Sequence, residues 1–576
     1  MRTLAAVSLT AVLFAGCATP PRPPAYDLLI RDAEIYDGSG GAPFRGEVAV
    51  TGDRIAYVGT RAPGAGQAVI DAGGKAVSPG FINMLSWATE SLIVDGRGLS
   101  DLKQGVTLEV MGEGTSMGPL SPEMKRLEVQ RMGDIKYPIE WTSLDEYLTY
   151  LERRGLSVNV ASFVGAATAR QHVLGEGDVD PTPEQLLAMR KLVVEAMEDG
   201  ALGVGSSLIY APASYAETPE LTALATEAGR CGGIYISHMR SEADRLLEAI
   251  DELIEISRLS GAPAEIYHLK AAGRANWPKI EAAIARIEAA RARGQRITAD
   301  MYTYTAGSTG LDAAMPPWVQ AGGVEAWIGR MKDPATRAKV LAEMRQETPA
   351  FENLYRHAGP EGTLLVGFKN PALKGLTGKS LADVAKARGV SPEDAAIDLV
   401  IEDGSRVQVV YFLMSEENVK RQTALPWMSF GSDASAQAPE GVFMKSSTHP
   451  RAYGNFARLL GKYVREEKAT SLPSAIHRLS ALPARNLGLK DRGLLKAGYF
   501  ADVVVFDPAT VGDKGTYEAP KQFATGVSHV VVNGAVVLSD GEPTGAKAGK
   551  VVRGRAWKGW ADGGCRPTAR DWSWAW

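Results

Sequence analysis

The stretch GIYISHMRSEADRLLEAIDELIEISRLSGAPAEIYHLK, residues 233–270, decides the fold of this chain. It holds two short apolar runs, 233–237 and 264–267, each followed by a polar residue, with a long helical segment between them. Short β-rich runs that alternate with helical segments are typical of βα units, whose successive strands lie parallel in one sheet. The stretch therefore predicts an α/β fold built on a parallel sheet.

The same alternation extends along most of the chain. Runs of this kind lie at 76–85, 106–111, 157–164, 201–206, 233–237, 264–267, 296–300 and 428–431. Eight parallel strands with intervening helices predict a (β/α)8 TIM barrel, whose active site lies at the carboxyl ends of the strands. A ninth run, 408–413, has no place in this count, and about 307–406 is expected to be an insertion between the last two barrel strands.

One of the intervening helices has clear signals at both ends. Thr182 is a good N-cap residue, Pro183 suits the first helical position and Gln185 completes a capping box. Gly200 is the expected stop. The segments between the runs are therefore expected to be true helices.

Both ends of the sequence have a residue pattern typical of β-strands. Apolar and polar residues alternate at 27–36 and 47–58 and again at 501–506 and 530–538, where Asn533-Gly534 is typical of a tight hairpin turn. We expect the two ends to form one small composite β-sandwich. The predicted organisation is a signal peptide and tether at 1–24, the sandwich at 25–76 and 488–553, the barrel with its insertion at 77–487 and a C-terminal tail at 554–576.

The first residues predict export. Arg2 precedes an apolar run, 4–15, that is too short to span a membrane and is typical of a signal peptide. The small residues before Cys17 resemble a bacterial lipobox, and Ala18 after it favours the outer membrane, so we expect a periplasmic-side lipoprotein whose lipid anchor on Cys17 is its contact with the membrane. Plain secretion is the alternative.

The other two cysteines, Cys231 and Cys565, are too few for a disulfide framework. A single bridge between them and a free buried Cys231 both remain open. The charges are nearly balanced, with 63 Lys and Arg against 67 Asp and Glu and a net charge of −4. With no basic excess and no long run of one sign, nucleic acid is not an expected partner.

Four polar residues follow predicted strands. His238 and His268 come directly after successive runs, Glu113 lies between two glycines after the second run, and Asp433 follows the last. In a barrel they would meet at one mouth, where two imidazoles and a carboxylate suit a zinc-type ion and an aspartate can move protons. Each also has a simpler interpretation: hydrogen bonding for the histidines, a turn for Glu113 and a helix cap for Asp433.

Five short motifs make the sequence recognisable. They are SPGFIN at 78–83, SHMR at 237–240, YHLK at 267–270, GSD at 431–433 and HPR at 449–451. With the composite terminal sheet, they resemble the amidohydrolase superfamily over about 27–553, closest to its N-acyl-D-amino-acid deacylase (D-aminoacylase) branch. The resemblance implies a metal-dependent amide hydrolase with His238 and His268 as metal ligands and Asp433 as general base. It also suggests substrate contacts from Tyr210, Lys270, Tyr302 and Arg451, with Arg451 the natural partner of a substrate carboxylate.

The sequence departs from the family in its metal ligands. The first strand of such enzymes ends Asp-x-His-x-His, whereas this chain has Leu85 and Trp87 at the histidine positions. The branch's second-strand cysteine aligns with Gly114, and Glu113 is one residue earlier. We therefore expect one divalent ion, Zn²⁺, held by the two strand-end histidines with Glu113 as the third ligand.

These expectations combine into one functional hypothesis. The chain would hydrolyse a linear amide, an N-acyl-D-amino acid or a related N-acyl amino acid or dipeptide, through metal-activated water and Asp433 as general base. Two alternatives remain open: a cyclic amidase of hydantoinase or dihydroorotase type, and a catalytically inactive envelope lipoprotein that binds a ligand.

Overall fold

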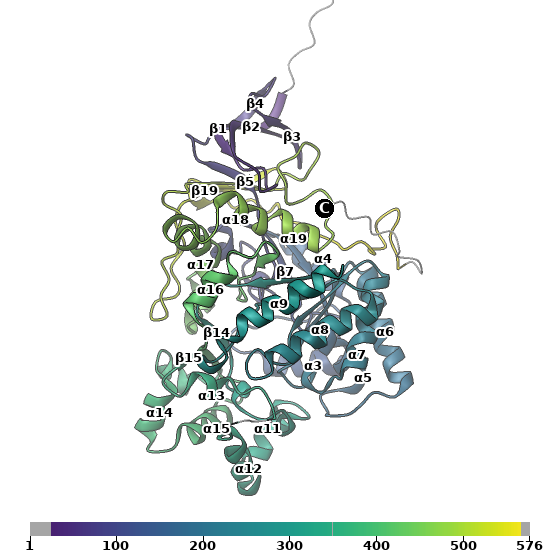
Figure 1. Ribbon diagram of the computed structural model, residues 1–576, viewed down its shortest axis with the longest axis vertical. Helices are drawn as coiled ribbons and strands as arrows, with labels where there is room; N and C mark the ends of the chain where they lie inside the picture. The colour runs from purple at the N-terminus through teal and green to yellow at the C-terminus, as the bar shows by residue number, and fades with distance from the viewer. Residues whose placement is uncertain (1–24, 348–349, 566–576) are drawn as a thin grey trace, which may run out of the picture.

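The structure is a computed structural model that describes residues 25–347 and 350–565 (Figure 1). The predicted signal peptide, lipobox cysteine and tether, and the tail beyond residue 565, lie outside the described residues. Within the described ranges, no helix is both long enough and apolar enough to span a bilayer.

Two parallel sheets form the centre of the molecule. The larger has the strand order β17 (Met428–Phe430), β13 (Ile297–Met301), β12 (Ala264–Ile266), β11 (Ile234–His238), β10 (Gly203–Ser207) and β9 (Val164–Gly165). The smaller has the order β6 (Phe81–Asn83), β7 (Val106–Met111) and β8 (Asn159–Ser162). All their neighbouring strands are parallel, as the βα alternation predicts.

Both edges of the smaller sheet are hydrogen bonded to the larger one. Beside β6, Met84 N donates to Phe430 O at 3.2 Å, and beside β8, Leu202 N donates to Ser162 O at 3.0 Å. Nearly every residue of these strands is buried. Burial on both faces explains why the strands read as continuous apolar runs rather than as alternating ones.

Helices pack along the outside of the larger sheet. Figure 1 shows α6 (Pro183–Glu198), α7 (Thr218–Arg230), α8 (Leu246–Ser260) and α9 (Lys279–Ala292) side by side. The predicted capping box of α6 is present: Thr182 accepts from the Gln185 backbone, and Gln185 accepts from the Thr182 backbone. The helix ends at Glu198, two residues before the expected Gly200 stop.

Eleven other helices are shorter than these four. They are α1 (Ser91–Val94), α2 (Leu99–Leu102), α3 (Pro122–Arg131), α4 (Leu144–Arg154), α5 (Ala166–Leu174), α10 (Pro317–Gln320), α13 (Leu354–Ala358), α16 (Glu416–Gln422), α17 (Arg451–Arg458), α18 (Leu472–Leu479) and α19 (Ala481–Asn486).

The two ends of the described chain pair in one nine-stranded sheet. Its strands are β1 (Ala25–Ile35), β2 (Phe44–Thr51), β3 (Arg54–Gly59), β4 (Ala65–Asp71), β5 (Ala76–Pro79), β18 (Val503–Phe506), β19 (Val527–Val532), β20 (Ala535–Ser539) and β21 (Glu542–Pro543). Antiparallel pairing of β5 with β18 joins the N-terminal and C-terminal parts. The predicted run 76–85 is thus two strands in two sheets. They divide at Gly80, where a Cβ atom would lie 2.1 Å from Thr107 Oγ1.

The predicted insertion forms a separate lobe, at the bottom of Figure 1. Its antiparallel sheet has β16 (Gln408–Phe412) between β14 (Ala306–Gly310) and β15 (Thr363–Gly367). Around it lie α11 (Val324–Met331), α12 (Pro334–Met344), α14 (Leu381–Arg388) and α15 (Pro392–Asp403). Residues of these elements share a hydrophobic core that includes Trp327 and Val409. The unplaced run 408–413 is therefore the central strand of this lobe, not a strand of the parallel sheets.

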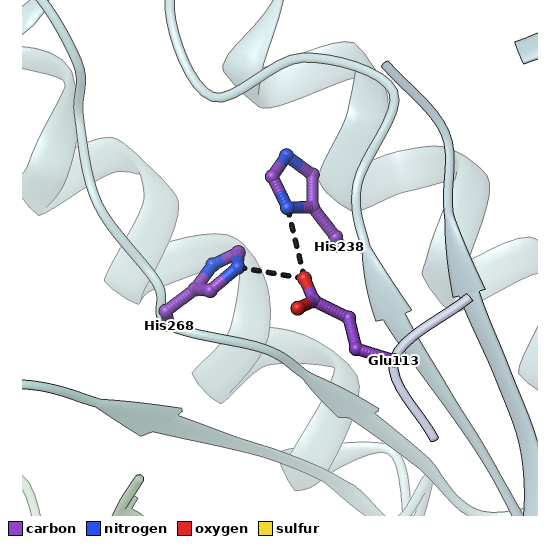
Figure 2. Close-up of side chains that lie close together, drawn as sticks. All are labelled: Glu113, His238 and His268. Carbon is purple, nitrogen blue, oxygen red and sulfur yellow. Dashed lines mark hydrogen bonds and ion pairs between the residues drawn. The ribbon is translucent and has the colours of Figure 1, made fainter. Parts of the chain in front are cut away.

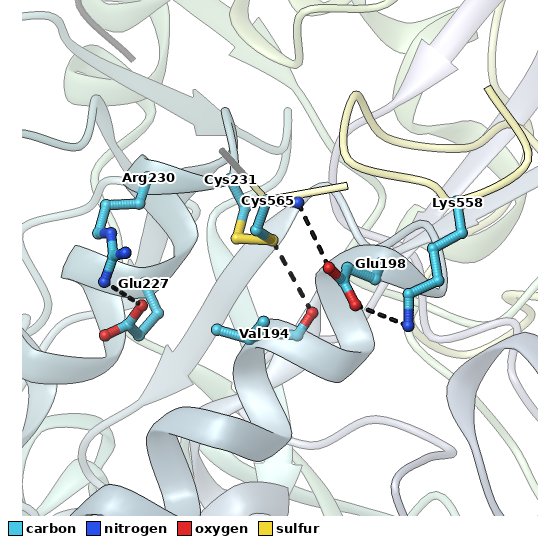
Figure 3. The surroundings of a disulfide bond; sticks show 7 residues. All are labelled: Val194, Glu198, Glu227, Arg230, Cys231, Lys558 and Cys565. Carbon is cyan, nitrogen blue, oxygen red and sulfur yellow. Dashed lines mark hydrogen bonds and ion pairs between the residues drawn. A yellow bond between two sulfur atoms is a disulfide. The ribbon is translucent and has the colours of Figure 1, made fainter. Parts of the chain in front are cut away.

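A disulfide bond joins Cys231 to Cys565 (Figure 3). Cys231 directly follows Arg230, the last residue of α7. Near the bond, Lys558 pairs with Glu198 of α6 at 2.7 Å. The sequence left open whether Cys231 is a free thiol or is bonded to Cys565. The structure shows the disulfide bond, so Cys231 is not a free thiol.

Candidate metal centre

Three side chains converge from the carboxyl ends of three parallel strands. His238 is the last residue of β11, His268 lies two residues beyond β12 and Glu113 two beyond β7. Glu113 is held in a tight turn by Gly112, where a Cβ atom would lie 2.4 Å from Phe163 O. His268 has a positive φ of 34°, and its backbone N–H donates to Asp300 Oδ1 at 2.9 Å.

Figure 2 shows both imidazoles turned toward one carboxylate oxygen. His238 Nδ1 lies 3.1 Å and His268 Nε2 3.0 Å from Glu113 Oε1. One donor atom from each side chain lies within 4.8 Å of the others, and all three residues are buried. Two imidazole nitrogens and a carboxylate oxygen are a donor set that zinc accepts, and an ion in this place would leave room for a fourth ligand. The donor set that the sequence predicted is therefore assembled in space.

The electrostatics favour an ionised Glu113. Burial by itself raises the pKa of this carboxyl, but hydrogen bonds from His238 and His268 outweigh burial and hold its pKa well below the usual range. For His268, burial and the Lys270 ammonium lower the pKa, yet Glu242 and Glu113 outweigh them and raise it to about 10. The carboxylates of Glu113 and Glu242 thus favour a positive charge, a proton or a cation, beside the two histidines.

Glu242 was missed by the sequence analysis. Its Oε1 lies 2.9 Å from His268 Nδ1 and 2.6 Å from Lys270 Nζ. The Lys270 ammonium also lies 2.8 Å from His268 Nδ1, so it has partners within the chain. A carboxylate that orients the far nitrogen of a ligand histidine is common in metal sites. No signal in the sequence identified it, because Glu242 lies in the loop between β11 and α8 rather than at the end of a strand.

Trp87 makes a contact that its sequence position did not suggest. Its indole Nε1–H donates to Glu113 Oε2 at 2.8 Å, while Oε1 of the same carboxylate faces the two histidines. Leu85, two residues earlier, is buried. These two positions therefore hold a buried apolar side chain and an N–H donor to Glu113, and neither is a metal ligand.

Asp433 lies three residues beyond β17 and forms an ion pair with Arg451. Arg451 Nη2 is 2.9 Å from Asp433 Oδ2. Burial raises the pKa of Asp433, although Arg451 opposes the rise, and Glu113 and His268 are among the charges that act on it. Two further donors of Arg451, Nε and Nη1, are buried without a hydrogen-bond partner among the described residues.

The two predicted tyrosines flank the histidines. The Tyr210 ring lies 5.2 Å from the His238 ring, and the Tyr302 ring lies 6.2 Å from the His268 ring. The Arg451 guanidinium lies 4.4 Å from the centre of the Tyr302 ring. Contacts therefore connect all eight sequence-predicted site residues in one region at the carboxyl ends of the strands.

A donor set of two histidines and a glutamate, with an aspartate nearby and parallel strands beneath, defines a candidate metal-dependent hydrolase. The comparison with known families agrees, because the amidohydrolase family model matches residues 68–538. This chain belongs to the amidohydrolase family. It is a hydrolase of carbon–nitrogen bonds other than peptide bonds, in the branch of the D-aminoacylases, as the motifs predicted.

Relatives of this branch match nearly the whole chain. A D-aminoacylase of Alcaligenes xylosoxydans xylosoxydans is 32% identical over 528 residues, which cover 92% of this chain and 97% of the relative. An N-acyl-D-glutamate deacylase from Bordetella bronchiseptica, solved with zinc and a phosphonate mimic of the tetrahedral intermediate, has a TM-score of 0.75 and 30% identity. A D-aminoacylase solved in a study of one-metal activation and second-metal attenuation gives the same two values, and both structures cover 92% of this chain and 100% of their own.

Proposed function

We propose that the chain removes the acyl group from N-acyl-D-amino acids by metal-dependent hydrolysis of the amide bond. The observation that carries this proposal is the convergence of His238 and His268 on one oxygen of Glu113 in a region that also holds Asp433. The relatives support the substrate class, because they are named as deacylases of N-acyl-D-amino acids. Related N-acyl amino acids and dipeptides share the same reacting bond.

The cofactor in this proposal is a single Zn²⁺ ion. His238, His268 and Glu113 would hold it, and their ligand types fit zinc. Leu85 and Trp87 support a single ion, since neither provides a metal ligand where the family has histidines. Bound there, the ion supplies Lewis-acid chemistry, lowering the pKa of water and polarising the amide carbonyl.

Asp433 is the proposed proton carrier. As a base it takes a proton from the attacking water, and as an acid it passes this proton to the leaving amine nitrogen. A raised pKa suits both roles, because a pKa nearer to the working pH lets one carboxyl group accept a proton and give it up again. The Arg451 ion pair would hold the carboxylate in place during both transfers.

Arg451 also has the features of a substrate anchor. Its Nε and Nη1 have no partner among the described residues, and two N–H groups of one guanidinium can bind both oxygens of a carboxylate. The α-carboxylate of an acyl amino acid provides such a group. In this proposal Lys270 adds positive charge nearby while its ion pair with Glu242 fixes its position.

Tyr210 and Tyr302 are proposed to donate hydrogen bonds to the substrate. Burial raises the pKa of both phenols well above the usual value, so both keep their protons at neutral pH. A protonated phenol beside the reacting carbonyl can stabilise the negative oxygen that forms during attack. Their rings lie beside the two histidines, which supports this assignment.

We further propose that the two parallel sheets are a single (β/α)8 barrel. The hydrogen bonds at both edges of the smaller sheet support closure. In the proposed domain organisation, residues 25–76 and 488–553 form the β-sandwich that packs on the barrel, 77–487 form the barrel and its lobe, and 554–576 form the tail.

The proposed location is the periplasmic side of the envelope, with a lipid anchor on Cys17. The disulfide between Cys231 and Cys565 supports export, because such bonds persist mainly in oxidising compartments. Labelling with a radioactive fatty acid tests the anchor: Cys17→Ala should abolish incorporation, and incorporation that continues would contradict it.

Substrate profiling tests the function. Zinc-loaded protein is offered N-acetyl-D-amino acids, N-acetyl-L-amino acids, dipeptides and hydantoins, and release of free amine or ring opening is measured. The proposal predicts turnover of linear N-acyl-D-amino acids that falls by at least about 100-fold in Asp433→Asn. Turnover of hydantoins alone would establish a cyclic amidase, and tight ligand binding without turnover would establish an inactive binding protein.

A further inference from the structure

Building on the metal site of the proposed function but not on its reaction, we propose that Glu352 of the lobe is a positioning residue that acts on the metal centre through Glu242. Glu352 lies between α12 and α13 of the lobe, whereas Glu242 lies between β11 and α8, beside the larger parallel sheet. Glu242 in turn contacts His268, a residue of the metal centre. The lobe would thereby help to form the site.

Both oxygens of the Glu352 carboxylate bind the loop that carries Glu242. Oε1 accepts a hydrogen bond from the backbone N–H of Glu242 at 2.9 Å, and Oε2 accepts one from the Ser241 hydroxyl at 2.7 Å. The Ser241 oxygen itself accepts from the backbone N–H groups of Ala243 at 3.3 Å and Arg245 at 3.1 Å. One carboxylate from the lobe therefore holds the whole turn that follows β11.

The lobe makes two further contacts with the same loop. Arg356 Nη1 lies 3.1 Å from Asp244 Oδ2. Ala243 is fully buried and belongs to the same hydrophobic core as Leu354, at the start of α13. The lobe thus contributes to the placement of each residue from 241 to 244.

The Glu242 side chain connects this loop to the metal centre. Its Oε1 lies 2.9 Å from His268 Nδ1 and 2.6 Å from Lys270 Nζ. The other ring nitrogen of His268, Nε2, lies 3.0 Å from Glu113 Oε1, in the place proposed for the ion. Because the backbone and the carboxylate of Glu242 move together, a loop released by the lobe would also release the His268 ring. A ligand histidine whose far nitrogen loses its partner binds metal more weakly.

Glu352 acts through the positions of its oxygens rather than through its charge. Both of its donors, a backbone N–H and a hydroxyl, are neutral. Burial raises the pKa of Glu352 to about 7, so the carboxyl is close to half protonated at neutral pH. The protonated group still accepts from Glu242 N and can donate its proton to Ser241 Oγ, so both contacts persist. A glutamine can make the same two contacts, whereas a methionine can make neither.

The test measures the zinc affinity of the full chain by competition with a chromogenic chelator. Glu352→Met removes both acceptors and should weaken zinc binding about tenfold, the low end of the range for residues that orient metal ligands. Glu352→Gln should stay within about threefold of the wild type, since it keeps both contacts. Glu361→Met is the matched control and should leave the affinity unchanged, because Glu361 is an exposed glutamate of the same lobe, between α13 and β15.

A double-mutant cycle with Glu242→Ala separates positioning from a general structural effect. Without the Glu242 carboxylate, the loop has no contact to pass to His268, so adding Glu352→Met should change the zinc affinity less than about twofold. A purely structural effect would instead add in full. Where Glu352→Met does not fold, Glu352→Asp takes its place in the cycle with an expected loss of at least about threefold, since a side chain one methylene shorter cannot reach both donors.

The outcomes separate clearly. An unchanged affinity in folded Glu352→Met, an equal loss in Glu352→Gln, or the same loss with and without the Glu242 carboxylate would overturn the proposal. So would a loss in Glu361→Met as large as that in Glu352→Met. Zinc affinity is measured whether or not the protein hydrolyses N-acyl-D-amino acids, so failure of the proposed reaction is a separate result.

Discussion

Replacing Trp87 with phenylalanine tests whether this residue positions the metal-binding carboxylate. The substitution removes the indole N–H that donates to Glu113 Oε2 at 2.8 Å but keeps an aromatic ring in place. Without this bond, the Glu113 carboxylate is free to rotate away from the two histidines. We therefore expect weaker metal binding, with the fold unchanged.

The size of the effect follows from the type of hydrogen bond. A bond to a charged acceptor contributes about 1.5–3 kcal/mol, and every ~1.4 kcal/mol is a factor of ten in affinity. Trp87 is 38% exposed, so water can replace part of the lost interaction. The expected loss in zinc affinity is roughly 10- to 100-fold, the range found for residues that orient metal ligands.

Competition with a chromogenic chelator measures the zinc affinity directly. The matched control is Trp560→Phe, because Trp560 is 40% exposed and its indole also donates a hydrogen bond, to Gly554 O at 2.9 Å. Trp560→Phe should bind zinc as tightly as the wild type. The reasoning is refuted if Trp87→Phe changes the zinc affinity less than twofold, or if both variants lose affinity equally while their thermal unfolding is unchanged.

Three other substitutions give separate predictions. Asp433→Asn should lower kcat by about 10²- to 10⁴-fold with the bound metal retained, and a smaller loss would exclude this residue as the proton carrier. Burial holds the pKa of His449 well below its usual value, so the folded protein keeps it neutral while the unfolded chain takes up a proton below about pH 6.5. Stability should therefore fall as the pH drops below about 6.5, with a slope that approaches about 1.4 kcal/mol per pH unit, and denaturant unfolding should show a shallower slope in His449→Asn. Cys565→Ser should cost about 2–4 kcal/mol of unfolding free energy, with no change on adding reductant, whereas reductant should destabilise the wild type to the same level.

Much of the central fold could be predicted because buried strands leave short apolar runs in the sequence. Each of the eight apolar runs contains a strand of the parallel sheets, since strands buried on both faces must be apolar along their length. The lobe was predicted only as an insertion. Its strand β14 has the sequence AGSTG, which has no apolar residue except alanine and gives no strand signal. Without β14 and β15, the central strand β16 had no partners in the sequence and could not be placed.

The candidate site was predictable where residues follow strands. The position of His238, His268 and Glu113 after parallel strands was enough to bring them together. Glu242 and Trp87 could not be assigned in this way, because their roles depend on which side-chain atoms meet across the site. The disulfide was equally hidden, since 334 residues separate its cysteines.

The central claim is that two histidines and Glu113 hold one catalytic metal ion. Its most direct test is the metal content of purified protein by mass spectrometry, measured together with deacylation of an N-acetyl-D-amino acid. We predict about one equivalent of zinc in active wild-type protein, and loss of both zinc and activity in folded His268→Ala. Full activity in metal-free protein, or zinc and activity retained in His268→Ala, would contradict the account.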